Sequence, residues 1–191
     1  MDLSLASTLT AFSALFIVMD PFSSVPVFIS LTRSFSREKK GEAALLAALV
    51  ATGVTLGFLF AGPYILGVMG IRIGSFQIAG GVLMFLIAVS FALGIEFGKR
   101  QKTPVEAVII GVPMLAGPGV MLTVMLLSHS LSLESVVAAS LAACAASYAI
   151  LLLSSRLHTL IGQSGLEILS RVMGVLLAAF AMEYILRGLG L

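Results

Sequence analysis

Charged residues are scarce in this sequence. Asp, Glu, Lys and Arg together make up 10% of the 191 residues, whereas 59% are hydrophobic, and the mean hydropathy is +1.14. A soluble domain needs more polar side chains than this to cover its surface. The shortage excludes an ordinary soluble globule, and we expect an all-α polytopic membrane protein that forms a single transmembrane domain over residues 1–191.

Residue types that carry chemistry are also few or scattered. Cys144 is the only cysteine, so no intrachain disulfide can form. His129 and His158 lack metal-ligand spacing, and no nucleophile–base pair or phosphate-binding loop is present. We therefore expect no enzyme and no cofactor, and the sequence leaves open whether a proton or sodium acts as a coupling ion. The basic residues stand at the ends of apolar stretches rather than among aromatic residues, which argues against a nucleic-acid partner.

What the sequence does contain is a series of long apolar stretches. A transmembrane helix needs ~20 apolar residues, and short polar loops separate stretches of about that length or more. We therefore expect six transmembrane helices. They cover about residues 5–31, 43–69, 75–94, 105–128, 135–153 and 166–186.

The Lys and Arg residues in the loops predict the orientation. The loops after the first, third and fifth stretches hold eight of them, whereas the remaining loops and the two termini hold two. Positive charge favours the cytoplasmic side, so both termini should be external. Tyr64 and Tyr184 then fall at the external interface. The first set is Arg33, Arg37, Lys39, Lys40, Lys99, Arg100, Lys102 and Arg156, and the second is Arg72 and Arg187.

Two prolines interrupt the first apolar stretch where it is deepest. Pro21 and Pro26 lack a backbone donor and push the preceding residue out of helical geometry. We expect a helix that ends near Val18 and resumes near Val27. The serines between the prolines, Ser23 and Ser24, can cap the resumed helix.

The carboxylate of Asp20 lies at the start of this break. Its insertion into lipid costs ~2.5–3.5 kcal/mol, so it should face protein or water. Two roles fit the residue, and they are compatible. It could bind a substrate ammonium, a coupling proton or a cation, or it could cap the backbone donors exposed by Pro21.

The two halves of the chain repeat one pattern. Pro21 and Pro113 are 92 positions apart, and so are Pro26 and Pro118. Three spans per half is an odd number, so the second copy must insert upside down relative to the first. We expect inverted repeats over about residues 1–97 and 104–191, with the first and fourth helices discontinuous. The second break covers Pro113–Gly119.

Four motifs resemble the MarC family of prokaryotic inner-membrane proteins over essentially the whole chain. That family includes small neutral amino acid transporters that move glycine and alanine, so the resemblance implies a multi-pass inner-membrane secondary transporter. Family members often carry Gly-Asn where this chain has Ser23-Ser24. The motifs are Asp20-Pro21-Phe22-Ser23-Ser24-Val25-Pro26, Ile78-Ala79-Gly80-Gly81-Val82-Leu83, Pro113-Met114-Leu115-Ala116-Gly117-Pro118-Gly119 and Arg171-Val172-Met173-Gly174-Val175-Leu176.

We expect a substrate site where the two breaks meet. The amino ends of the resumed helices would face the substrate carboxylate, while Asp20 and unpaired carbonyls near Val18, Met19 and Leu115 would take the ammonium. Small residues leave room for a hydrogen or methyl side chain, although they could instead be packing contacts. The candidate substrate-binding residues are Asp20, Pro21, Ser23, Ser24, Pro26, Ala79, Gly80, Gly81, Pro113, Ala116, Gly117, Pro118 and Gly119.

Other functions remain open from the sequence. The protein could be a non-transporting membrane scaffold or sensor whose breaks only shape an interface. It could also export another small metabolite or a drug, which would require a larger apolar cavity. The expected partners are a small amino acid substrate and the lipid bilayer, and a homo-oligomer is left open.

Overall fold

The computed structural model describes residues 5–94 and 115–191, and every element within them is a helix. This confirms the all-α fold. The helices are α1 (Leu5–Met19), α2 (Pro21–Leu31), α3 (Arg37–Val68), α4 (Ile73–Leu93), α6 (Pro118–Ser130), α7 (Leu133–Leu152) and α8 (Ser154–Leu189). Side-chain caps begin three of these helices: Asp20 at α2, Ser36 at α3 and Ser132 at α7 each accept a hydrogen bond from a backbone N–H in the first turn.

Within residues 5–94 and 115–191, five helical segments are long and apolar enough to cross a membrane. α1 and α2 together form the first of them, Leu5–Leu31, and α3, α4, α7 and α8 are the others. α6 is apolar but shorter. It covers the second part of the expected fourth span, whose first part lies outside the described residues.

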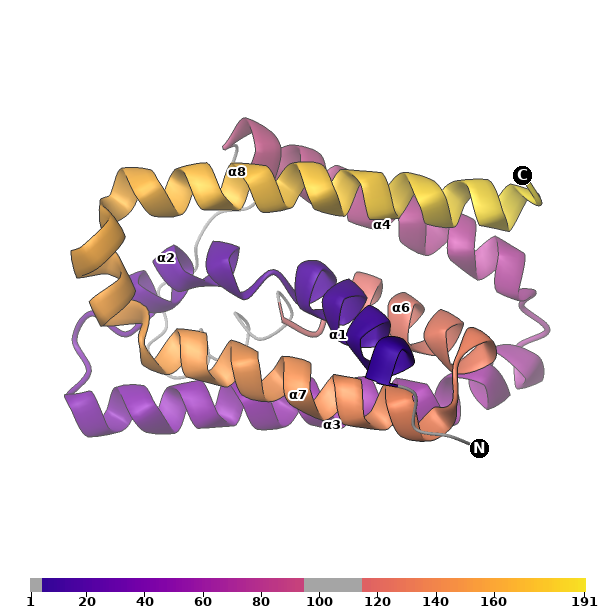
Figure 1. Ribbon diagram of the computed structural model, residues 1–191, viewed down its shortest axis with the longest axis horizontal. Helices are drawn as coiled ribbons and strands as arrows, with labels where there is room; N and C mark the ends of the chain where they lie inside the picture. The colour runs from indigo at the N-terminus through magenta and orange to yellow at the C-terminus, as the bar shows by residue number, and fades with distance from the viewer. Residues whose placement is uncertain (1–4, 95–114) are drawn as a thin grey trace.

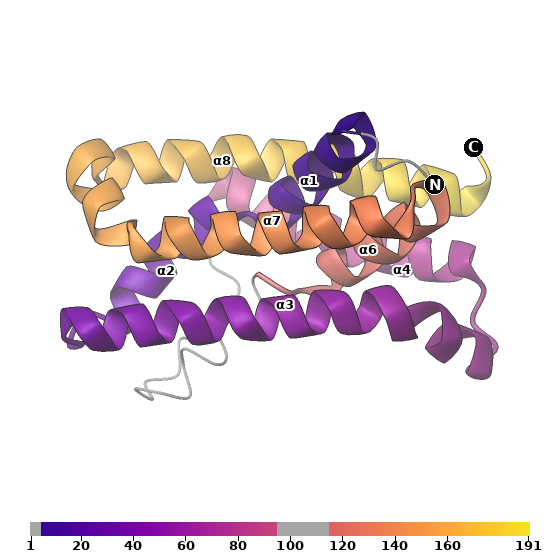
Figure 2. The same cartoon turned by 60° about the horizontal axis from the view of Figure 1, so that its bottom comes forward.

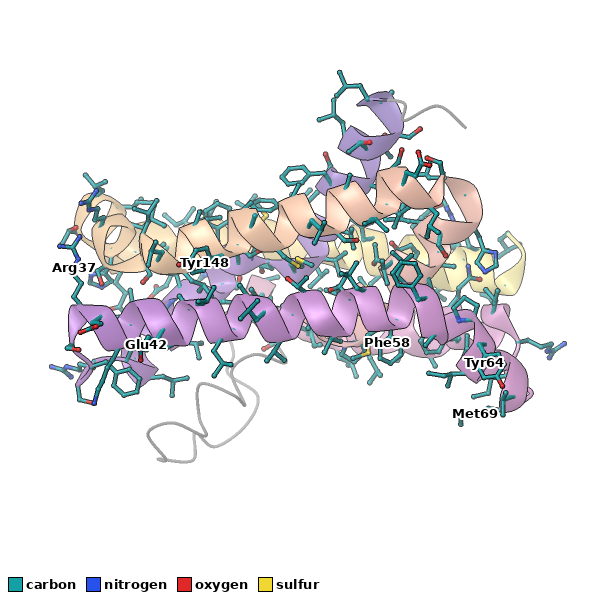
Figure 3. The ribbon with its side chains drawn as sticks, turned by 90° about the horizontal axis from the view of Figure 1, so that it is seen from below. Arg37, Glu42, Phe58, Tyr64, Met69 and Tyr148 are labelled. Atoms are coloured by element: carbon teal, nitrogen blue, oxygen red, sulfur yellow. The ribbon has the colours of Figure 1, made fainter. Side chains whose placement is uncertain are left out.

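The helices run along one long axis as an elongated bundle (Figures 1 and 2). α4 packs along α8, while α7 packs against both α1 and α3. α1, α2 and α6 lie between these two layers (Figure 1). In Figure 3, Arg37 lies at one end of α3 and Tyr64 and Met69 lie near the other, so this helix spans the length of the bundle.

Small residues bring α4 and α8 close together as an antiparallel pair. A Cβ added to Gly174 of α8 would lie 2.6 Å from Ala92 N and 2.9 Å from Ala88 O of α4. These are backbone atoms, so the two helices could approach this closely only with glycine there. The seam repeats every seven residues on both helices. Its pairs are Gly74 with Gly188, Gly81 with Ala181, and Ala88 with Gly174.

α3 and α7 bury corresponding positions of the two halves of the chain. Seven buried residues of α3 each have a buried counterpart 92 positions later in α7. The two helices therefore turn matching faces toward the protein interior. The residues of α3 are Ala43, Ala44, Ala47, Ala48, Ala51, Thr55 and Leu59, and those of α7 are Ser135, Val136, Ala139, Ser140, Ala143, Ser147 and Leu151.

Three helices begin six or more residues before the position expected from the sequence, and one of them is α3, which begins at Arg37 and not near Ala43. The helix after the first break begins at Pro21 and not near Val27, so the interruption is one residue, Asp20. Proline suits the first position of a helix, where its missing N–H has no role. α8 begins at Ser154 and not near residue 166, with a non-helical residue, Gly162 (φ 72°, ψ 175°), inside it. Glycine allows this left-handed conformation, so helical structure can resume directly after it.

Candidate functional site

Asp20 joins α1 to α2 in a left-handed conformation. Its φ is 40° and its ψ is 64°, and among the described residues it is the only non-glycine residue with positive φ. The residue is 3% exposed and lies inside the first membrane-spanning segment. Left-handed backbone is uncommon outside glycine and is found at functional sites more often than elsewhere. A strained, buried carboxylate in a membrane span is therefore the starting point for a site.

The Asp20 side chain caps α2. Its Oδ1 accepts from the backbone N–H of Ser23 at 3.2 Å, and its Oδ2 accepts from the Ser23 hydroxyl at 2.5 Å. The Ser24 hydroxyl donates to the Asp20 carbonyl at 3.4 Å. The two serines thus lie in the first turn of α2. The capping role expected of Asp20 is confirmed, whereas neither Ser23 nor Ser24 is the cap. Within the described part of the chain, no cationic side chain pairs with this carboxylate.

The start of α6 packs beside the end of α1. A Cβ added to Gly119 would lie 2.8 Å from Met84 Cγ and 3.0 Å from Val18 Cγ1. Gly119 is the second residue of α6, where the backbone N–H has no intrahelical acceptor. Gly117 occupies the N-cap position of this helix, and no side chain accepts a hydrogen bond there. α6 therefore begins without a capping side chain, next to Val18, which lies two residues before Asp20.

Buried apolar side chains surround this meeting point. Leu15, Val18 and Met19 of α1 are buried, and they pack in one cluster with Met84 of α4 and with Val120 and Leu122 of α6. From α7, the Ser147 hydroxyl lies 3.9 Å from Met19 Sδ. Packing of this kind excludes water and strengthens any charge interaction inside it.

The other predicted site residues of the two breaks differ in how deeply they are buried. Pro21, Ser23 and Ser24 are buried beside Asp20, while Pro26 is half-buried one turn further along α2. Leu115 and Ala116 are buried and Gly117 is half-buried, whereas Pro118 is exposed. Pro113 lies outside the described residues.

The predicted site residues of α4, Ala79, Gly80 and Gly81, lie next to different neighbours. A Cβ on Gly80 would lie 2.8 Å from Leu122 Cδ2 of α6, and one on Gly81 would lie 2.9 Å from Ala181 O of α8. Ala79 is exposed. Among these three residues, Gly80 is the one that packs against α6, whereas Gly81 belongs to the α4–α8 seam.

One polar pair was not expected from the sequence. The Tyr184 hydroxyl of α8 donates to Thr123 Oγ1 of α6 at 3.0 Å, and both side chains are buried. Tyr64 is 75% exposed, as an interfacial tyrosine should be, but Tyr184 is 5% exposed and faces the interior. The burial of Thr123, one helical turn after Gly119, could not be read from a uniformly apolar stretch.

The described residues contain no group of His, Cys, Asp and Glu that could hold a metal ion. The place where α1, α2 and α6 meet offers the Asp20 carboxylate, serine hydroxyls and the backbone groups of helix ends. Groups of these kinds can bind a small charged or zwitterionic molecule.

Comparison with known proteins gives one family. A family model described as "MarC family integral membrane protein" matches residues 5–190. A UPF0056 membrane protein of Aquifex aeolicus is 34% identical over 193 residues, covering 94% of this chain and 90% of that protein. The UPF0056 inner membrane protein YhgN of Escherichia coli K12 is 33% identical over 181 residues and 92% of each chain. No solved structure matches the chain significantly.

Proposed function

Because the chain belongs to the MarC family of integral membrane proteins, we propose that it is a secondary transporter of small neutral amino acids such as glycine and alanine. One observation carries the proposal. A buried carboxylate, Asp20, interrupts a membrane-spanning segment, and the uncapped start of α6 packs beside it. Helix ends that meet inside a membrane are the binding sites of many secondary transporters. The Escherichia coli relative is an inner membrane protein, so the proposal includes a prokaryotic inner membrane for this chain, and the loop charges add that both termini are external.

The proposed architecture is two inverted three-helix repeats, and the packing supports it. Exchanging the halves turns the α2–α7 contact into α6–α3, and it turns α2–α8 into α6–α4. All four contacts are present. The buried positions shared by α3 and α7 agree with the same exchange. Such repeats allow one half to rock against the other around a fixed site.

The different caps of α2 and α6 indicate where the carboxylate and the ammonium of the substrate would bind. Asp20 already occupies the start of α2, so the start of α6, with no side-chain cap, is the better place for the substrate carboxylate. The Gly119 N–H and the positive end of the α6 dipole would face it. Asp20 and the carbonyls that end α1 would take the ammonium. This arrangement leaves the cap in place and uses the charge of Asp20 as well.

The packing around Gly119 favours a small substrate. Met84 and Val18 fill the space in front of Gly119, so this conformation is closed around the site. Methionine is unbranched and adapts its shape readily, and a small movement of Met84 would admit a ligand. A hydrogen or methyl side chain demands the least movement from these neighbours.

The test is uptake of labelled glycine by proteoliposomes that contain the purified protein. Excess unlabelled alanine should compete with it, and repeating the assay with imposed proton and sodium gradients would identify a coupling ion. A folded protein that takes up neither amino acid under any gradient would contradict the proposal and favour a scaffold or sensor.

A further inference from the structure

A cavity of about 220 Å³ lies between α1, α6 and α8, separate from the Asp20 break. It is at the end of the bundle where α1 begins and where α6 and α8 end (Figure 1). Its polar lining comes from all three helices. Those residues are Thr10, Ser130, Glu183, Tyr184 and Arg187.

An ion pair borders this cavity on α8. Arg187 Nε donates to Glu183 Oε1 at 2.8 Å, and both side chains are about half exposed. An exposed pair of this kind contributes only ~0–1 kcal/mol to stability, so a ligand can replace it at little cost. The guanidinium has five N–H donors, and this bond uses one of them. A negative group can therefore bind Arg187 while Glu183 remains available to a positive one.

The remaining lining combines hydroxyl oxygens with an apolar wall. Thr10 donates to Ala6 O at 2.9 Å and Ser130 donates to Leu126 O at 3.3 Å, so both hydroxyl oxygens can still accept. Leu127 and Phe180 supply apolar surface. At the inner side, Tyr184 is bonded to Thr123, which lies one turn from Gly119. The cavity thus lies between the bundle end and the buried Tyr184–Thr123 pair.

We propose that this cavity is an outer binding site for a small zwitterion, namely an amino acid on its way to the transport site. Arg187 binds the carboxylate, Glu183 binds the ammonium, and a small side chain lies against Leu127 and Phe180. Pockets for drug-sized ligands have volumes of ~300–1,000 Å³, so this one suits a smaller molecule. The inference rests on the proposed transport function for the identity of the ligand.

The test is protection of a cysteine inside the cavity. Ser130→Cys in a Cys144→Ala background places one thiol in the lining, and its rate of alkylation by a maleimide is measured with and without glycine or alanine. At a ligand concentration ~10 times Kd, a single site should slow alkylation ~10-fold. His129→Cys in the same background is the matched control, because His129 is exposed beside Ser130 and is not in the lining. Its rate should not change.

Ligands that carry only one charge, and variants of Arg187, test whether both charges of the zwitterion are bound in the cavity. Methylamine and acetate each carry only one of the two charges and should give much weaker protection at the same concentration. Arg187→Gln should abolish protection, whereas Arg187→Lys should retain part of it. Equal protection by glycine in wild type and Arg187→Gln would overturn the assignment.

The outcomes also separate this inference from the transport proposal. Asp20→Asn should lose uptake but keep protection, since the cavity does not include Asp20. Protection in a protein that never transports glycine would support the cavity and contradict the transporter. Glycine uptake without protection would overturn the cavity alone. Protection that requires phosphatidylethanolamine in the membrane and is unaffected by glycine would make the cavity a lipid headgroup site, which also overturns the inference.

Discussion

Gly119 and Val18 bring two distant parts of the chain into contact: a Cβ added to Gly119 would lie 3.0 Å from Val18 Cγ1. Val18 is two residues before the carboxylate that separates α1 from α2, and Gly119 is two residues after the cap of α6. The end of one helix and the start of another therefore share one place inside the bundle.

Enlarging Gly119 should block transport. In Gly119→Ala the new methyl group presses on Met84, which can shift, so the protein should fold while glycine uptake falls severalfold. Gly119→Leu should abolish uptake. Gly57→Leu is the matched control, because a Cβ at Gly57 meets nothing within 4 Å. Uptake is measured in proteoliposomes, and folding is checked by thermal unfolding. Normal uptake by folded Gly119→Leu would remove α6 from the site.

Removing the charge of Asp20 should weaken substrate binding. Asp20→Asn keeps an oxygen that can accept from Ser23 but loses the negative charge. Hydrogen bonds to charged groups contribute ~1.5–3 kcal/mol, so the affinity for glycine should fall ~10-fold or more. The pH dependence of uptake should flatten if Asp20 carries the coupling proton. Wild-type affinity, rate and pH profile in Asp20→Asn would leave the residue with a capping role only.

Removing the cap as well should reduce stability. Asp20→Ala leaves the Ser23 N–H and hydroxyl without their acceptor and keeps a side chain in left-handed backbone. Loss of an N-cap costs ~0.5–2 kcal/mol, and Asp20→Asn should lose less than this. Thermal unfolding in detergent compares the two variants. Equal melting temperatures for Asp20→Ala and wild type would show that the cap does not stabilise the fold.

The α4–α8 seam should tolerate no added bulk. Gly174→Val would place atoms against Ala88 O and Ala92 N, and backbone atoms cannot yield unless the helices separate. Overpacking costs ~1–3 kcal/mol, which should appear as a lower melting temperature. Gly53→Val is the control, since a Cβ at Gly53 has open space around it. Equal melting temperatures for the two variants would refute the close approach.

The Tyr184–Thr123 hydrogen bond should stabilise the bundle. Tyr184→Phe keeps the ring but leaves the buried Thr123 hydroxyl without this donor, which should cost ~1 kcal/mol. Tyr64→Phe serves as the comparison, because that side chain is 75% exposed. The free energy of unfolding in denaturant measures both. An unchanged value for Tyr184→Phe would mean that Thr123 finds another partner.

Labelling should fix the orientation of the bundle. Lys39 and Arg72 are both exposed; Lys39 lies in the first turn of α3, and Arg72 lies beyond the other end of α3, at the start of α4. In a Cys144→Ala background, Lys39→Cys should react with an impermeant thiol reagent only from the cytoplasmic side, and Arg72→Cys only from outside. Labelling of Lys39→Cys in intact cells would reverse the proposed topology.

The sequence by itself determined the class of the protein and the position of the break in its first span. In lipid, every backbone polar group must be satisfied within the protein, so the long apolar stretches of this chain are expected to be helices. An aspartate followed by proline inside such a stretch must interrupt it. Asp20 was therefore identifiable without coordinates. The repeat spacing between Pro26 and Pro118 was equally visible.

The tertiary structure decided which face of each helix meets which neighbour. Gly80 and Gly81 are adjacent in sequence, yet one faces α6 and the other faces α8. Tyr184 turns inward to Thr123, 61 positions away. Lipid tails are as apolar as helix surfaces, so hydropathy does not distinguish a residue that faces lipid from one that faces another helix. Close packing and hydrogen bonds between helices make that distinction, and they exist only in the assembled bundle.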